Sequence, residues 1–100
     1  MPTFEQHCNE CVEKLGKPYE EVHKWLDEFM NADFLPLLKK TRHRQFRHHQ
    51  AGMEEIRKLF GDDAVKAAEI HIRADLASDN YPEHNPLPLD KEHFERLQLW

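Results

Sequence analysis

Two His/Asp pairs with the same spacing are the part of this sequence best suited to chemistry. His23 precedes Asp27 by four residues, and His71 precedes Asp75 by four. Residues four apart share one face of an α-helix, so each carboxylate can orient its imidazole or bind the same metal ion. Helical bundles build metal sites from such facing positions. The alternative for each pair is a solvent-facing ion pair that stabilises its helix only weakly.

A third histidine, His49, lies in a stretch that predicts one long helix over residues 39–60. The apolar residues of this stretch step by three and four, as they do on one side of an α-helix. The same phase places Arg42 and His49 among the apolar positions, and buried ionisable groups need a partner. We therefore expect the functional site on this face. Gly52, which costs about 1 kcal/mol relative to Ala inside a helix, is interpreted as a point of close approach and not as a break.

These histidines and carboxylates predict a metal site. Neutral imidazole nitrogens and carboxylate oxygens suit a divalent ion such as Zn, Fe, Mn or Ni. If the protein is an enzyme, a metal-activated water is the expected nucleophile, which indicates a metal-dependent hydrolase. Whether it is an enzyme, and on which substrate it acts, stays open. The first-choice metal ligands are His23, Asp27, His49, His71 and Asp75, and the second-choice ligands are His7, His43 and His48.

Two other functions also stay open. In the first, the His, Arg and Asp residues form a buried polar network that fixes the bundle, and the protein is a non-catalytic interaction module. In the second, a basic run at residues 39–47 binds phosphate or nucleic acid, because arginine forms bidentate contacts with phosphate. A formal net charge of −5 argues against general nucleic-acid binding. The candidate anion-binding residues in this run are Arg42, Arg44 and Arg47.

The cysteines indicate a reducing compartment. Cys8 and Cys11 lie too close together for a stabilising disulfide, and no second cysteine pair completes a zinc site, so both are predicted core residues. The sequence has no apparent signal peptide and no long apolar run. We expect a cytoplasmic protein without membrane contact, and we leave its partners, including further copies of itself, open.

Cap and stop residues predict the helices that must position these side chains. Thr3 and Gln6 form a capping box for a first helix, which Gly16 ends. Pro18 suits the first turn of a second helix, which carries the first His/Asp pair. Asp33 is the expected cap of the long helix.

The second half of the chain continues the same pattern. Gly61 ends the long helix, Asp62 or Asp63 is expected to cap the next, and Asp90 caps a short helix that presents Phe94. Three prolines predict an irregular arm at residues 78–89. The predicted fold is all-α, a small bundle of four main helices with a short C-terminal helix after a Pro-rich arm, forming a single domain over residues 1–100.

Four segments carry a resemblance to a known family. They are residues 22–27 (Val-His-Lys-Trp-Leu-Asp), 42–52 (Arg-His-Arg-Gln-Phe-Arg-His-His-Gln-Ala-Gly), 59–61 (Leu-Phe-Gly) and 71–76 (His-Ile-Arg-Ala-Asp-Leu). Together they resemble a family of small, uncharacterised proteins from bacteria and their phages. The pattern of that family is an early His, then His-x-Trp-Phe-Asp, Arg-His-Arg-x-x-Arg-His-His-x-x-Gly, Phe-Gly and His-x-Arg-Glu-Asp-Leu. The matching positions are His7, His23, Trp25, Asp27, Arg42, His43, Arg44, Arg47, His48, His49, Gly52, His71, Arg73 and Asp75.

The sequence departs from this pattern in a few places. Ala74 stands where the family has Glu, the tail from Ser78 is longer and richer in proline, and neither cysteine belongs to the pattern. The resemblance implies a recurrent site but no activity, because the family is itself a domain of unknown function.

Overall fold

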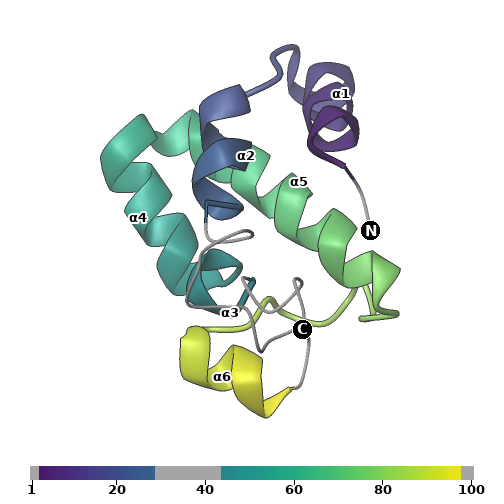
Figure 1. Cartoon of the computed structure of the whole chain (residues 1–100), viewed down its shortest axis with the longest axis vertical. Helices are drawn as coiled ribbons and strands as arrows, with labels where there is room; N and C mark the ends of the chain where they lie inside the picture. Colours follow the sequence, from purple (N-terminus) through teal and green to yellow (C-terminus); the bar gives the residue numbers. More distant parts are fainter. Residues whose placement is uncertain (1–2, 29–43, 98–100) are drawn as a thin grey trace.

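The protein is an assembly of α-helices around one long central helix. A computed structural model describes residues 3–28 and 44–97, and every regular element in these two ranges is an α-helix (Figure 1). None of these helices is long and apolar enough to cross a membrane. The predicted all-α class is confirmed. The elements are α1 (Phe4–Leu15), α2 (Glu20–Leu26), α3 (Arg44–Arg47), α4 (Gln50–Phe60), α5 (Asp62–Ser78) and α6 (Lys91–Arg96).

Helix α5 is the central element. It contacts α1, α2 and α4, and Figure 1 shows it running between α1 and α4, with α6 at the far end of the molecule from α1. Its buried positions recur at steps of three and one, which gives a wide stripe that several neighbours can cover. The stripe is apolar except for one His/Asp pair. Its members are Ala64, Ala67, Ala68, His71, Ile72, Asp75 and Leu76.

Helix α1 begins and ends as its sequence predicts. The Thr3 side chain accepts from the Gln6 N–H, the Gln6 side chain accepts from the Thr3 N–H, and Gly16 closes the helix in the left-handed conformation. The buried face of the helix carries His7 beside the cysteines. Cys8 and Cys11 are buried and not disulfide-bonded, and burial raises the pKa of Cys11 to about 11, so its thiol stays protonated. Both cysteines are core residues, as predicted.

Helix α2 starts two residues later than its sequence suggests. Pro18 precedes the helix, and Tyr19 is its N-cap in a left-handed conformation (φ 54°, ψ 47°). The helix ends at Leu26, and Asp27 is its C-cap. Because the helix ends there, Asp27 lies at the end of the helix and not on one of its faces.

The predicted continuous helix over residues 39–60 is wrong, because the chain turns at His48 and His49. His49 has extended backbone angles (φ −155°, ψ 176°) and is the N-cap of α4. Its Nδ1 accepts from the Gly52 N–H at 3.0 Å. The N–H groups of Gln50 and Ala51 donate to carbonyls of the C-terminal arm, at 2.8 and 2.9 Å. These bonds satisfy the first free donors of α4, which is why the helix can begin here.

Gly52 marks a close approach, as predicted, but its neighbour is the chain just before the turn. A Cβ at Gly52 would lie 2.0 Å from the carbonyl oxygen of Arg47, so no larger residue fits without moving backbone. Gly61 ends α4, as predicted, and also serves as the N-cap of α5. Asp62 and Asp63 fall in the first turn of α5, so the predicted aspartate cap is wrong.

The Pro-rich arm is anchored to the helices. Gln50 Nε2 donates to the Leu87 carbonyl at 2.9 Å, and Arg73 Nη1 donates to the Asn85 carbonyl at 2.7 Å. Asp90 then caps α6 as predicted, and the buried Phe94 returns to the core. The arm therefore fixes the start of α4. The core cluster consists of Cys11, Val22, Leu26, Ile56, Ala64, Ala67, Ala68, Ile72, Leu76, Leu87 and Phe94.

Several predictions fall on residues outside the two described ranges. These are the Asp33 cap and the positions of Lys39, Lys40, Arg42 and His43 in the basic run.

Candidate metal centre

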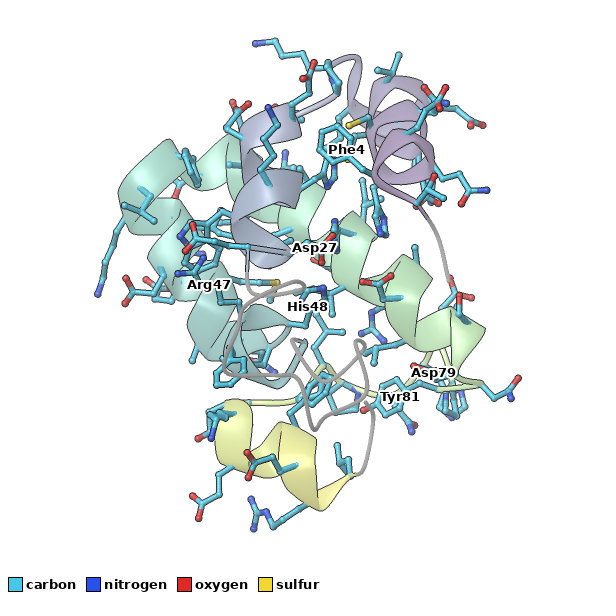
Figure 2. The ribbon with its side chains drawn as sticks, in the orientation of Figure 1. Phe4, Asp27, Arg47, His48, Asp79 and Tyr81 are labelled. Atoms are coloured by element: carbon cyan, nitrogen blue, oxygen red, sulfur yellow. The ribbon has the colours of Figure 1, made fainter. Side chains whose placement is uncertain are left out.

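Four polar side chains from three segments converge beside α5. Asp27 comes from the end of α2, His48 from the turn before α4, and His71 and Asp75 from α5 itself. One nitrogen or oxygen of each lies within 4.8 Å of the corresponding atoms of the other three. Figure 2 shows Asp27 and His48 close together where α2, α4 and α5 meet. We call these four residues the His2Asp2 group.

The four atoms lie close enough together that they could hold a metal ion. His48 Nε2 lies 3.0 Å from Asp75 Oδ2 and 3.4 Å from Asp27 Oδ1. His71 Nε2 lies 3.3 Å from Asp75 Oδ2 and 3.4 Å from Asp27 Oδ1. Ligands about 2.0–2.2 Å from a tetrahedral ion are about 3.3–3.6 Å apart. Three of the four separations, at 3.3–3.4 Å, match edges of such a tetrahedron, and the fourth, between His48 and Asp75, is the length of a hydrogen bond.

The group is buried and rich in negative charge. The side chains of His48, His71 and Asp75 are at most 3% exposed, whereas Asp27 is 20% exposed. Burial alone would raise the pKa of Asp75, but its contacts with His48 and His7 outweigh this and hold the pKa well below its usual range. With neutral imidazoles, two carboxylates leave two negative charges, which one divalent cation would cancel.

His23 lies outside the group and contacts it through His71. Its Nδ1 lies 2.8 Å from Nδ1 of His71, and its Nε2 lies 2.9 Å from the Pro18 carbonyl oxygen. Its ring is fully buried. Burial, with smaller contributions from His71 and His7, lowers the pKa of His23 to about 4. His23 is therefore neutral at neutral pH and supports one member of the group.

His7 contacts the group from α1. Its Nε2 lies 3.3 Å from Asp75 Oδ1, the oxygen of that carboxylate that does not face His48 and His71. Its ring stacks on His71, with ring centroids 3.6 Å apart and planes 15° apart. His7 therefore restrains both α5 members, and it would orient the carboxylate of Asp75 if that residue bound a metal.

The structure changes which of the predicted ligands belong to the group. Asp27, His71 and Asp75, all first choices, lie in the His2Asp2 group, and so does His48, a second choice. His49 does not, because its ring caps α4. His23 and His7 lie next to the group without being members of it, and His43 lies outside the described residues.

The exchange of His48 for His49 follows from the turn before α4. On the predicted helix, His49 would have pointed to the apolar side; the turn instead sends His48 inward and leaves His49 at the helix start. The contact between Gly52 and the Arg47 carbonyl accompanies this turn. A glycine three residues after a His-His pair was the one signal of the turn in the sequence, and it is also consistent with an uninterrupted helix.

Arg47, a predicted anion-binding residue, is engaged within the molecule. Its Nη1 donates to the Trp25 carbonyl at 2.7 Å, its guanidinium lies 4.0 Å from the centre of the Trp25 ring, and Nη2 lies 3.4 Å from Glu28 Oε1. These contacts hold the end of α2, and with it Asp27, beside α3. Arg42 and the side chain of Arg44 lie outside what the structure describes.

Comparison with known proteins places the chain in a family without assigning an activity. No curated protein and no solved structure matches it. A family model described as "Domain of unknown function (DUF6915)" matches residues 3–84, a range that contains the His2Asp2 group together with His7 and His23. The chain therefore belongs to the DUF6915 family, a domain of unknown function.

Proposed function

We propose that this protein binds one divalent transition-metal ion through the His2Asp2 group. The ligand atoms would be Asp27 Oδ1, His48 Nε2, His71 Nε2 and Asp75 Oδ2. The observation that carries the proposal is the set of four nitrogen–oxygen separations of 3.0–3.4 Å in a buried site. Imidazole and carboxylate together suit Zn, Fe, Mn or Ni, and the donor set does not select among them.

The alternative is a metal-free polar network in which protonated imidazoles neutralise the two carboxylates. The orientation of His71 favours the metal. Two carboxylate oxygens lie 3.3 and 3.4 Å from its Nε2, yet among the described residues this buried atom makes no hydrogen bond of acceptable geometry. An N–H at this position would be an unsatisfied buried donor, costing about 1–3 kcal/mol, whereas a lone pair there is suited to a cation between the three atoms.

A metal-holding role fits this geometry better than hydrolysis does. Catalytic zinc sites keep one position for water, whereas four protein ligands fill a tetrahedral site. Hydrolysis would require Asp27, the most exposed of the four ligands, to yield or share its position. We therefore propose a metal site whose first role is to tie α2, the turn before α4 and α5 together.

Thermal unfolding with and without metal tests the proposal. Purified protein is stripped with a chelator and its Tm measured before and after addition of Zn, Mn, Fe(II) or Ni. A ligand present at 1,000 times its Kd should stabilise the fold by about 4 kcal/mol. The rise in Tm should vanish in Asp75→Asn and persist in Asp63→Asn, an exposed aspartate at the start of α5. No rise with any of the four ions would contradict the proposal.

A further inference from the structure

We infer that His23 is a positioning residue that fixes the tautomer of His71, so that the Nε2 lone pair of His71 points into the His2Asp2 group. This inference deepens the proposed function and rests on it for its consequence, metal affinity. It concerns a residue outside the four ligands, and its geometric part can be measured without any metal.

The directions of the two hydrogen bonds of His23 can be assigned by starting from the Pro18 carbonyl. The Pro18 carbonyl can only accept, so His23 Nε2, 2.9 Å away, must carry the hydrogen. A neutral imidazole has one donor and one acceptor, so His23 Nδ1 is the acceptor. His71 Nδ1, 2.8 Å from it, must then donate. A neutral His71 that donates from Nδ1 carries its lone pair on Nε2.

The surroundings of His23 favour its neutral form. The ring is fully buried, with the edge of Phe4 on one side (ring centroids 6.2 Å apart) and the rings of His7 and His71 at 5.6 and 5.0 Å. A cation among these rings would be costly without a directly paired carboxylate. The hydrogen bonds that run from His71 through His23 to the Pro18 carbonyl, here called the relay, require a neutral His23.

The local backbone positions the Pro18 carbonyl that accepts from His23. Tyr19 has a left-handed conformation, which is costly for a non-glycine residue and turns the chain sharply between Pro18 and α2. The Tyr19 carbonyl then accepts from the Val22 N–H to start α2. The preceding carbonyl, that of Pro18, is left facing His23 one turn later. A turn in the first fifth of the chain thereby sets the protonation of a side chain on α5.

The consequence is that His71 Nε2 is suited to contact a bound metal ion and lies in an unfavourable environment without one. The lone pair of His71 Nε2 faces carboxylate oxygens of Asp27 and Asp75 at 3.4 and 3.3 Å, and like partial charges repel. This accounts for the absence of a hydrogen bond to this atom within residues 3–28 and 44–97. Metal-ligating histidines commonly donate their second N–H to a fixed acceptor, and here that acceptor is a neutral histidine.

Nitrogen NMR of the metal-free protein tests the tautomer directly. Protein labelled with 15N-histidine is recorded at neutral pH in long-range 1H–15N correlation spectra, as native chain and as three variants. We expect the Nδ1–H tautomer for His71 in the native chain and in His23→Gln, whose side chain can donate to Pro18 and accept from His71. We expect it to be lost in His23→Leu and kept in His84→Leu, which removes an exposed histidine. An Nε2–H tautomer or an imidazolium at His71 in the native protein would overturn the inference.

Metal titration separates this inference from the proposed function. His23→Leu should weaken Zn binding by about 10–100-fold, and His23→Gln should stay within a few-fold of the native affinity. If native protein binds no metal but shows the expected tautomer, the proposed function fails and the positioning role of His23 stands. If His23→Leu binds Zn as tightly as native protein, the metal site stands and the inference fails. Should His23→Leu not fold, the native spectrum and His23→Gln still decide.

Discussion

The two His/Asp pairs have the same spacing in sequence and different fates in space. On α5, His71 and Asp75 lie on one continuous helical face, and both enter the His2Asp2 group. On α2 the helix ends between the two residues, so Asp27 enters the group while His23 turns to the Pro18 carbonyl and the back of His71. The i,i+4 rule therefore identifies partners only where the helix continues through both residues.

The difference extends to burial. Asp75 is buried and contacted by three histidines, whereas Asp27 is partly exposed at a helix end. We therefore expect Asp75 to stabilise both the fold and the binding of an ion. We expect Asp27 to contribute mainly to the binding of the ion. Four experiments follow from this contrast.

The largest effect is expected at Asp75. Asp75→Asn removes the charge that His7, His48 and His71 share, and breaking such a buried pairing costs about 3–5 kcal/mol. Urea unfolding in the presence of Zn should show this loss, together with the loss of Zn binding. Asp63→Asn is the matched control and should change stability by no more than about 1 kcal/mol. An Asp75→Asn protein of native stability would remove the distinction between the two carboxylates.

The second test concerns the turn that supplies His48. Gly52→Ala would place a Cβ 2.0 Å from the Arg47 carbonyl oxygen, so backbone must move at the start of α4. We expect a destabilisation of about 2–4 kcal/mol, in the range of other overpacked sites, and weaker Zn binding because His48 shifts. Ala51→Gly, in the same turn on an exposed position, should cost about 1 kcal/mol or less and leave Zn binding unchanged. Equal behaviour of the two variants would show that the turn does not set the position of His48.

The third test uses pH on the metal-free protein. The pKa of His23 is lowered to about 4, so between about pH 6.5 and 4 the unfolded chain binds a proton that the folded chain does not. Stability from this group is therefore complete above about pH 6.5 and is lost as pH falls toward 4, by about 3 kcal/mol in total. Urea unfolding across this range, with chelator present, should show a shallower loss for His23→Gln than for the native protein. The same slope for both would show that His23 is not a buried neutral group.

The smallest effect on stability is expected at Asp27. In the absence of metal, Asp27→Asn should change the free energy of unfolding by about 1 kcal/mol or less, because the side chain is partly exposed at a helix end. Its affinity for Zn should nevertheless fall at least about tenfold, because loss of even a residue that only supports a ligand costs about 10–100-fold. Calorimetric titration and urea unfolding of one preparation check both statements. A loss of stability as large as that of Asp75→Asn would contradict the contrast between the two pairs.

The sequence predicted those features that depend on a few neighbouring residues. The Thr3/Gln6 capping box, the Gly16 stop and the Asp90 cap are local hydrogen-bond patterns, and all three are confirmed. The i,i+4 pair on α5 is equally local, because nothing interrupts that helix.

The turn at His48 and His49 could not be predicted in the same way. It depends on the carbonyls of Pro88 and Leu89, nearly forty residues away, which accept from the first N–H groups of α4. Without them, apolar periodicity favours the uninterrupted helix. The relay through His23 likewise depends on the left-handed Tyr19, a conformation that residue type alone would not suggest.

The metal content of two neighbouring variants tests the central claim most directly. Untagged native protein, His48→Ala and His49→Ser are purified identically and analysed by elemental mass spectrometry after saturation with Zn and removal of free ion. Serine is a good N-cap, so His49→Ser preserves the start of α4. We predict about one Zn per chain for native protein and His49→Ser, and a large loss for His48→Ala, since only His48 lies in the His2Asp2 group. Retention of Zn by His48→Ala with loss in His49→Ser, or no Zn on the native protein, would contradict the account.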